Sequence, residues 1–147
     1  MLRDRSLIPL SHQHHNALAL CVLTERALAS DSSSDSVSRL ARRVVDRYEL
    51  EMINHFELEE SLLFPRLAEL QELVDRLTAE HRQMRAMVEQ LRQEPSADTL
   101  RAFSSLLRSH VRLEESDLFE KAQQMLRRET LDEIGTMLEQ KAVRVCL

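Results

Sequence analysis

A histidine followed four residues later by a glutamate occurs twice, within nearly the same ten-residue block. HFELEESLLF spans residues 55–64 and HVRLEESDLF spans residues 110–119, and seven of the ten positions are identical. Residues i and i+4 lie on one face of a helix, and imidazole nitrogens and carboxylate oxygens are ligands for divalent metal ions. His55 with Glu59, and His110 with Glu114, are therefore candidate metal-binding pairs.

Both pairs continue apolar stripes that should face the interior of a helical protein. An aromatic residue lies seven positions before each histidine and an apolar residue three positions before it: Tyr48 and Met52 in the first copy, Phe103 and Leu107 in the second. A glutamate-rich helical chain also shows this spacing by chance on a solvated face, but two copies in phase with apolar stripes argue against that. Buried carboxylates that face each other repel unless cations lie between them. Each copy is thus predicted to supply half of a two-metal site.

The remaining histidines extend this pattern to two further helices. His81 has apolar residues at helical spacing after it, and so do both His14 and His15. The apolar spacing slightly favours His15, whereas the polar residue before His14, like the one before His81, favours His14. Periodicity does not separate these two, and His12 is expected to be exposed.

The elements that must position these residues are helices. Gly occurs once and Pro three times, and Leu, Ala, Glu, Arg, Gln and Met dominate the chain. Pro65 and Pro95 mark breaks, while Ser36, Asp98 and a Thr130–Glu133 capping box are candidate helix starts. The predicted fold is all-α: an up-down antiparallel four-helix bundle with a short additional C-terminal helix. The expected helices cover about residues 11–30, 37–64, 71–94, 98–128 and 130–141.

Composition argues against several classes of partner and location. The net charge is −5, and the 20 basic residues form no stripe, so no nucleic-acid surface is expected. No signal peptide is apparent, and no apolar run approaches the ~18 residues of a membrane span. Cys21 and Cys146 form no disulfide framework or CxxC motif, which suits a reducing cytoplasm. Cys21 is predicted to be a small core residue.

From about residue 10 to 128, the chain resembles the hemerythrin-like, or HHE cation-binding, family. The resemblance rests on four features of the sequence. They are His14/His15 after a short polar stretch, His55-x-x-x-Glu59-Glu60 with Leu-Phe-Pro after it, Glu80-His81, and His110-x-x-x-Glu114. The resemblance implies that residues 1–147 form a single hemerythrin-like domain holding a non-haem di-iron centre in an up-down bundle. Carried over by position, Glu59 and Glu114 would bridge two iron ions; His55 with His14 or His15 would ligate one, and His81 with His110 the other.

Two departures from hemerythrin proper bear on function. Hemerythrin proper has a second histidine on its third helix where this chain has Arg85, which cannot ligate because a guanidinium stays protonated. The last carboxylate of hemerythrin proper is an Asp five residues after the histidine, whereas Glu114 lies four residues after His110. The lost histidine opens a coordination position, which favours redox chemistry, peroxide reaction or sensing over simple oxygen carriage. Arg85 either points outward, leaving the gap to water, or places its charge near the open position and favours an anionic ligand.

Three residues near these candidates are expected to lie outside the ligand set. Glu60 and Glu115 follow the two bridging candidates and are expected to be solvated charges, with Glu60 the better reserve ligand. Tyr48 is expected to pack in the core, with a hydrogen bond near the metals as the alternative.

The function that follows is binding, sensing or reaction with oxygen, nitric oxide or peroxide at two iron ions, or the handling of iron. Manganese and zinc accept the same ligands. Two other functions remain open: a di-metal oxidase or peroxidase, and a metal-free helical interaction module. The small ligand is a diatomic molecule or a peroxide, and the sequence leaves the enzymatic status and the oligomeric state open.

Overall fold

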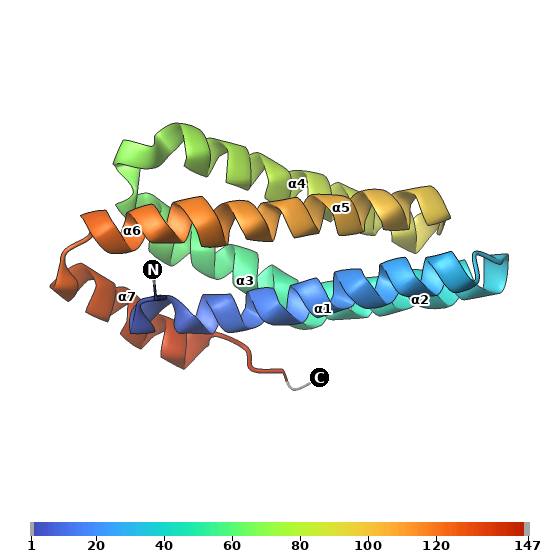
Figure 1. The fold of residues 1–147 in the computed structure, drawn as a ribbon, viewed down its shortest axis with the longest axis horizontal. Helices are drawn as coiled ribbons and strands as arrows, with labels where there is room; N and C mark the ends of the chain where they lie inside the picture. Colours follow the sequence, from blue (N-terminus) through green and yellow to red (C-terminus); the bar gives the residue numbers. More distant parts are fainter. Residues whose placement is uncertain (1, 146–147) are drawn as a thin grey trace.

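The computed structural model describes residues 2–145, which form helices and contain no strand, so the predicted all-α class is confirmed. Long helical segments lie along the length of the molecule, and the chain turns back between one and the next (Figure 1). Helix α1 packs against α2 and α5, and α4 also packs against α2 and α5. The bounds are α1 Ile8–Ser30, α2 Ser34–Arg47, α3 Ile53–Leu58, α4 Gln71–Gln93, α5 Ala97–Leu113 and α6 Phe119–Met125.

Two of these segments are interrupted by wider, π-helical turns. One lies between α2 and α3, at Tyr48–Met52, and another follows α3 at Glu59–Leu63. The third, Glu114–Leu118, joins α5 to α6. The sequence had predicted uninterrupted helices here. A π-helical turn adds a residue to the helical repeat and occurs often at functional sites; two of the three begin at the paired glutamates.

Serines start two of the long segments, though not at the predicted positions. Ser33, rather than Ser36, caps α2, and its hydroxyl accepts a hydrogen bond from the Ser36 N–H at 3.3 Å. Ser96, rather than Asp98, caps α5 in the same way. Each cap satisfies a backbone donor that the first helical turn leaves free.

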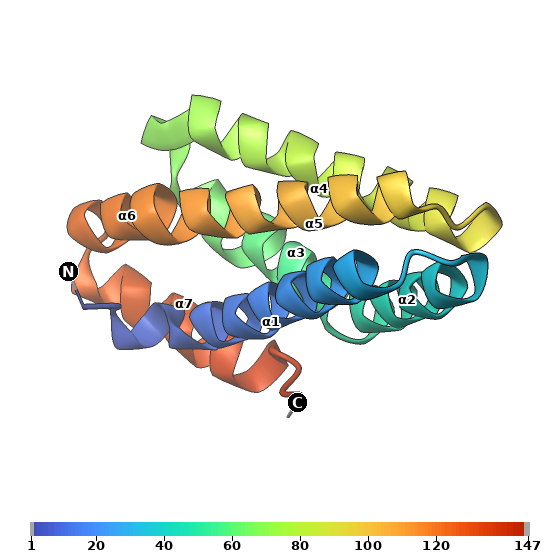
Figure 2. The ribbon, with the colours of Figure 1, turned by 45° about the vertical axis from the view of Figure 1, so that its right-hand side comes forward.

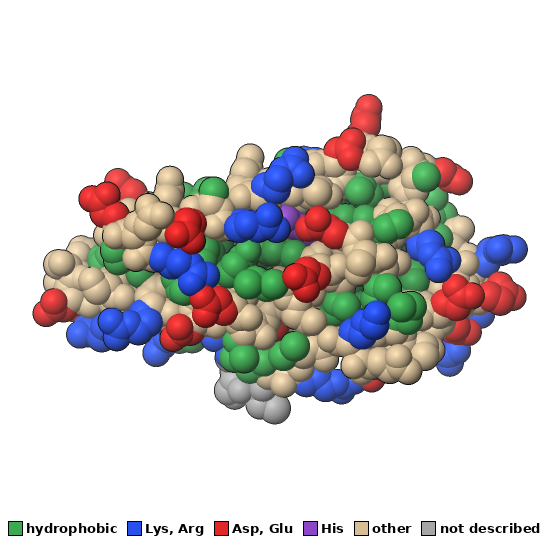
Figure 3. All heavy atoms as spheres, turned by 180° about the vertical axis from the view of Figure 1, so that it is seen from behind, with side chains coloured by type: hydrophobic (Ala, Val, Ile, Leu, Met, Phe, Trp, Pro, Cys, Tyr) green, Lys and Arg blue, Asp and Glu red, His purple; other side chains and the backbone are tan. Residues whose placement is uncertain are grey.

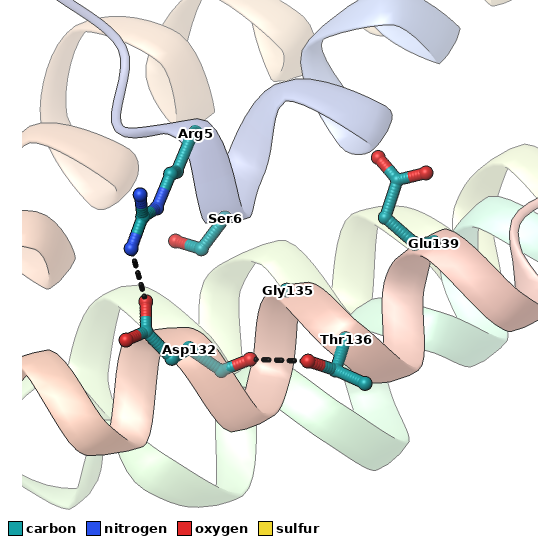
Figure 4. A pocket seen from close by; sticks show the side chains of 6 residues that line it. All are labelled: Arg5, Ser6, Asp132, Gly135, Thr136 and Glu139. Atoms are coloured by element: carbon teal, nitrogen blue, oxygen red, sulfur yellow. Dashed lines mark hydrogen bonds and ion pairs between the residues drawn. The ribbon is translucent and has the colours of Figure 1, made fainter.

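Helix α7 (Arg128–Lys141) lies against the start of α1 and the 3-10 turn Arg5–Leu7 (Figures 1 and 2). It begins without a side-chain cap, so the predicted Thr130–Glu133 capping box is wrong. The glycine Gly135 lies at this contact (Figure 4), and a Cβ added there would be 2.9 Å from the Ser6 Cα. The close approach of α7 thus depends on the missing side chain.

The core consists of two apolar clusters with a polar layer between them. His14 falls between Leu10, in one cluster, and Ala17, in the other. His81 similarly falls between Leu77 and Met84. Cys21 is buried in the first cluster, as predicted, and Cys146 lies outside the described residues. The polar layer is therefore closed off by apolar side chains at both ends.

Candidate metal centre

Six buried side chains from the long helical segments converge in the polar layer. Their ligand atoms form two groups, and both groups contain the same two glutamates. The first group is His14, His55, Glu59 and Glu114, and the second is Glu59, His81, His110 and Glu114. None of these side chains is more than 6% exposed. The layout is that of two adjacent candidate ligand groups with shared carboxylates.

The distances show how the glutamates lie between the histidines. Glu114 has one oxygen 2.9 Å from His14 Nε2 and the other 2.6 Å from His110 Nε2. Glu59 Oε1 lies 3.2 Å from His55 Nε2 and 3.3 Å from His81 Nε2. Each carboxylate is thus approached from both sides, as a bridging ligand would be.

Several polar atoms in this layer are buried without a hydrogen-bonding partner among the described residues. They are Nε2 of His14 and of His55 and all four carboxylate oxygens of Glu59 and Glu114. Burying such atoms unpaired costs several kilocalories per mole. Cations would satisfy them, and imidazole and carboxylate together suit iron, manganese or zinc. The donor set therefore fits metal ions.

The outward nitrogen of each clustered histidine contacts a polar side chain from another segment. His14 Nδ1 lies 2.6 Å from a Glu115 oxygen and His81 Nδ1 lies 2.7 Å from a Glu60 oxygen. The corresponding contacts of His110 with Glu80 and of His55 with Gln13 are both 2.8 Å. An Nδ1–H that donates outward leaves the inward Nε2 free to ligate.

These contacts correct the roles expected for Glu60 and Glu115. Both keep part of their side chains in solvent, 38% and 31% exposed, but each also holds a clustered histidine. Sequence reasoning missed this role, and it missed the roles of Gln13 and Glu80 too. The available signal was that each of these four residues adjoins a clustered histidine or glutamate in the chain.

Burial and the mutual charges shift the titration of the metal-free cluster. Burial, followed by the charge of Glu114, raises the pKa of Glu59 well above its ordinary value. Burial acts in the same direction on Glu114, but the charge of His110 and the nearby Glu59 and His14 side chains hold the Glu114 pKa well below the usual range. One carboxyl of the pair therefore keeps its proton, as expected for two acids that share a buried site.

The pKa values of three clustered histidines are also shifted in opposite directions. Burial alone would lower the pKa of His110, but Glu114 and Glu80 raise it to about 9. The pKa of His14 is also raised, because Glu114 and Glu115 outweigh its burial. Burial and then the charge of His14 lower the pKa of His55 to about 4. His55 is thus more ready than His14 or His110 to offer a lone pair.

The structure distinguishes between the alternatives left open by periodicity. It brings His14 into the cluster, whereas His15 is exposed and belongs to neither group. His12 is also exposed. Tyr48 is buried and packs edge-on against Phe56, as a core residue.

Arg85 is exposed, whereas the neighbouring Met84 is fully buried. It lines a surface groove together with Phe56 and Glu60. The α3 side of the molecule, seen from behind in Figure 3, shows hydrophobic side chains gathered between acidic and basic ones. The position that holds a second histidine in hemerythrin proper therefore points to the surface here.

A small enclosed cavity of about 10 Å³ borders the cluster, which is room for about one water molecule. Its lining includes His14, His55 and His110 from the cluster and the buried carboxylate of Glu51, which accepts a hydrogen bond from Asn16. The apolar part of the lining is formed by Ala17, Met52, Phe56, Leu107 and Val111. The cavity therefore has about the smallest size that can hold one water molecule beside the clustered nitrogens.

This geometry agrees with a comparison against protein families, in which the family model for the Hemerythrin HHE cation binding domain matches residues 8–122. The chain belongs to the hemerythrin HHE cation-binding family. No curated protein and no solved structure matched it. The buried groups of this hemerythrin-like chain could hold a metal cation. Between residues 2 and 145, no helix combines the length and apolar character needed to cross a bilayer.

Proposed function

We propose that this hemerythrin-like chain holds two iron ions and binds or reacts with a small ligand such as dioxygen, nitric oxide or peroxide. The proposal treats residues 1–147 as one domain, an up-down antiparallel four-helix bundle with α7 added. The observation that carries it is the pair of four-residue groups that share Glu59 and Glu114. His14 and His55 would hold one ion and His81 and His110 the other, with both glutamates between them.

Iron, when bound, would supply the affinity for small oxygen or nitrogen ligands and the capacity for electron transfer. The chain's own residues orient the site and keep it dry. Phe56 stacks on His81 with ring centroids 4.0 Å apart, and Phe119 stacks on His14 at 5.3 Å. The outward contacts of the histidines hold their Nε2 atoms inward. The small cavity limits the ligand to a few atoms.

One observation favours turnover over reversible oxygen carriage. With Arg85 at the surface, the second metal group has two histidines and the shared glutamates and no further histidine among the described residues. A di-metal oxidase or peroxidase is therefore the second candidate. Multiple turnovers of peroxide by the iron-loaded protein would favour the enzyme, and stoichiometric binding would favour the sensor or carrier.

Metal analysis together with the optical spectrum under air tests the proposal. We expect close to two iron ions per chain. Glu59→Ala and Glu114→Ala should each lose both ions, because a bridging ligand serves both sites, whereas Glu72→Ala, at an exposed position, should lose none. A protein that binds no metal when iron is supplied in excess, or a folded Glu59→Ala variant with full metal content, would contradict the proposal.

A further inference from the structure

After α7 ends, the C-terminal segment Ala142–Val145 is held against α1 and α3 by amide side chains. Asn54 donates to the Lys141 carbonyl at 3.1 Å and accepts from the Val143 N–H at 2.9 Å. Asn16 donates to the Val145 carbonyl at 3.1 Å. This segment has no regular structure of its own, so these hydrogen bonds fix its path.

Gln13 connects this segment to the metal cluster. Its Nε2 donates to the Val143 carbonyl at 3.0 Å and to Asn54 Oδ1 at 3.1 Å, while its Oε1 lies 2.8 Å from His55 Nδ1. A carbonyl can only accept, so the amide nitrogen must face Val143 and the amide oxygen must face His55. Gln13 is 2% exposed, so water cannot readily replace either contact. The C-terminal segment and Asn54 thereby together set His55 in the tautomer that carries hydrogen on Nδ1 and leaves Nε2 free.

The other three clustered histidines do not depend on this segment. Their outward partners are the carboxylates of Glu60, Glu80 and Glu115, which accept hydrogen bonds in any rotation. A hydrogen bond to a carboxylate is also about twice as strong as one to a neutral amide. His55 is therefore the one histidine of the cluster whose orientation rests on an uncharged partner that must itself be oriented.

We propose that Gln13 is a positioning residue for His55 and that the segment Ala142–Val145 controls it, so that release of this segment loosens the metal ion held by His14 and His55. The inference rests on the proposed two-metal function. Without the segment, the Gln13 amide nitrogen keeps only Asn54 Oδ1 as a partner, and Asn54 has itself lost the Val143 N–H that holds its oxygen in place. The Gln13 amide can then rotate more easily and present its NH₂ group to His55. Hydrogen then moves to Nε2, and that nitrogen no longer ligates. The His81 and His110 side keeps its carboxylate partners and is unaffected.

The test compares the full chain with a chain that ends at Lys141, each with Gln13 or with Gln13→Glu. The probe is Fe(II), removed by an excess of a coloured chelator without oxygen. Truncation should speed the release of one of the two ions by about 10–100-fold and leave the other unchanged. Gln13→Glu supplies a carboxylate that accepts in any rotation, so the truncated Gln13→Glu protein should release iron as slowly as the full chain. Glu80→Gln is the matched control. It should speed release of the other ion equally in the full and truncated chains.

A second measurement does not need metal. In metal-free protein, ¹⁵N NMR of the histidine side chains should show His55 with hydrogen on Nδ1 in the full chain and a mixture of tautomers after truncation. Equal release rates and equal tautomers in the two lengths would overturn the inference. Fast release from truncated Gln13→Glu would mean that the segment only covers the site, which would also overturn the role of Gln13. If the full chain binds no iron but truncation still changes the His55 tautomer, the proposed function is refuted and the role of Gln13 stands.

Discussion

His81 and His110 direct their Nε2 atoms at each other across 3.2 Å. Their Nδ1 atoms contact Glu60 and Glu80, so each ring has its hydrogen-bonding need met on the outer side. Two inward lone pairs at this distance repel unless a proton or a cation lies between them. In the metal-free protein His110 supplies that proton, because its pKa is raised to about 9. A metal ion would take its place.

Removing one of these rings should empty one site and spare the other. In His81→Ala, iron content should fall to about half, since His14, His55 and both glutamates remain for the other ion. Metal analysis of the purified variant checks this. His15→Ala is the control, because His15 is exposed and outside both groups, and its iron content should not change. Full iron content in His81→Ala would show that His81 is not a ligand.

Metal uptake should release protons at neutral pH. His110, with a pKa of about 9, carries a proton at neutral pH in the metal-free protein, and the raised pKa values of Glu59 and His14 act in the same direction. A ligating atom must give up its proton, so affinity should rise as the pH rises through the pKa of His110, about 9. Calorimetric titrations in two buffers of different ionisation enthalpy measure the protons released. Identical heats in both buffers would contradict the prediction.

The outward carboxylates should matter for affinity although they do not enter either metal group. Glu60→Gln and Glu115→Gln keep the shape of the side chain but replace a charged acceptor of His81 or His14 by an amide. Metal affinity should fall about 10–100-fold. A competition titration with a chelator measures it. Glu57→Gln, a nearby exposed glutamate, should have the affinity of the natural chain.

The sequence predicted the helical class and the clustered residue types because these follow from composition and periodicity. It left His14 and His15 unresolved because both have apolar neighbours at helical spacing. It did not reveal the π-helical turns at Glu59 and Glu114, whose residues are ordinary helix formers. The sequence also did not predict the outward hydrogen-bonding partners of the histidines, because contacts such as Gln13 with His55 join separate helices and depend on how these helices pack.

Arg85 is now expected to have no direct effect on ligand binding. Because Arg85 is exposed while Met84 is fully buried, its charge lies outside the polar layer that contains the metal cluster. Arg85→Leu should keep both metal ions and bind azide with unchanged affinity, measured by optical titration. A large loss of azide affinity would show that the guanidinium reaches the site.

Gly135 offers a test of how α7 is held. In Gly135→Ala the new Cβ would lie 2.9 Å from the backbone Cα of Ser6, so α7 or the turn Arg5–Leu7 must shift. Such overpacking costs about 1–3 kcal/mol, and the melting temperature should fall by several degrees. Thr136→Ala, beside it in the pocket of Figure 4, is the control and should change stability little. An unchanged melting temperature for Gly135→Ala would show that this contact yields easily.

The partial exposure of Glu60 and Glu115 has a consequence for electrical balance in the molecule. His81 and His14 are buried, but each is a single carboxylate away from bulk water. A proton that leaves either ring would therefore have a direct route to solvent through that carboxylate, without any helix moving. A change of charge in the buried layer can therefore be neutralised at the surface while the apolar clusters on both sides stay dry.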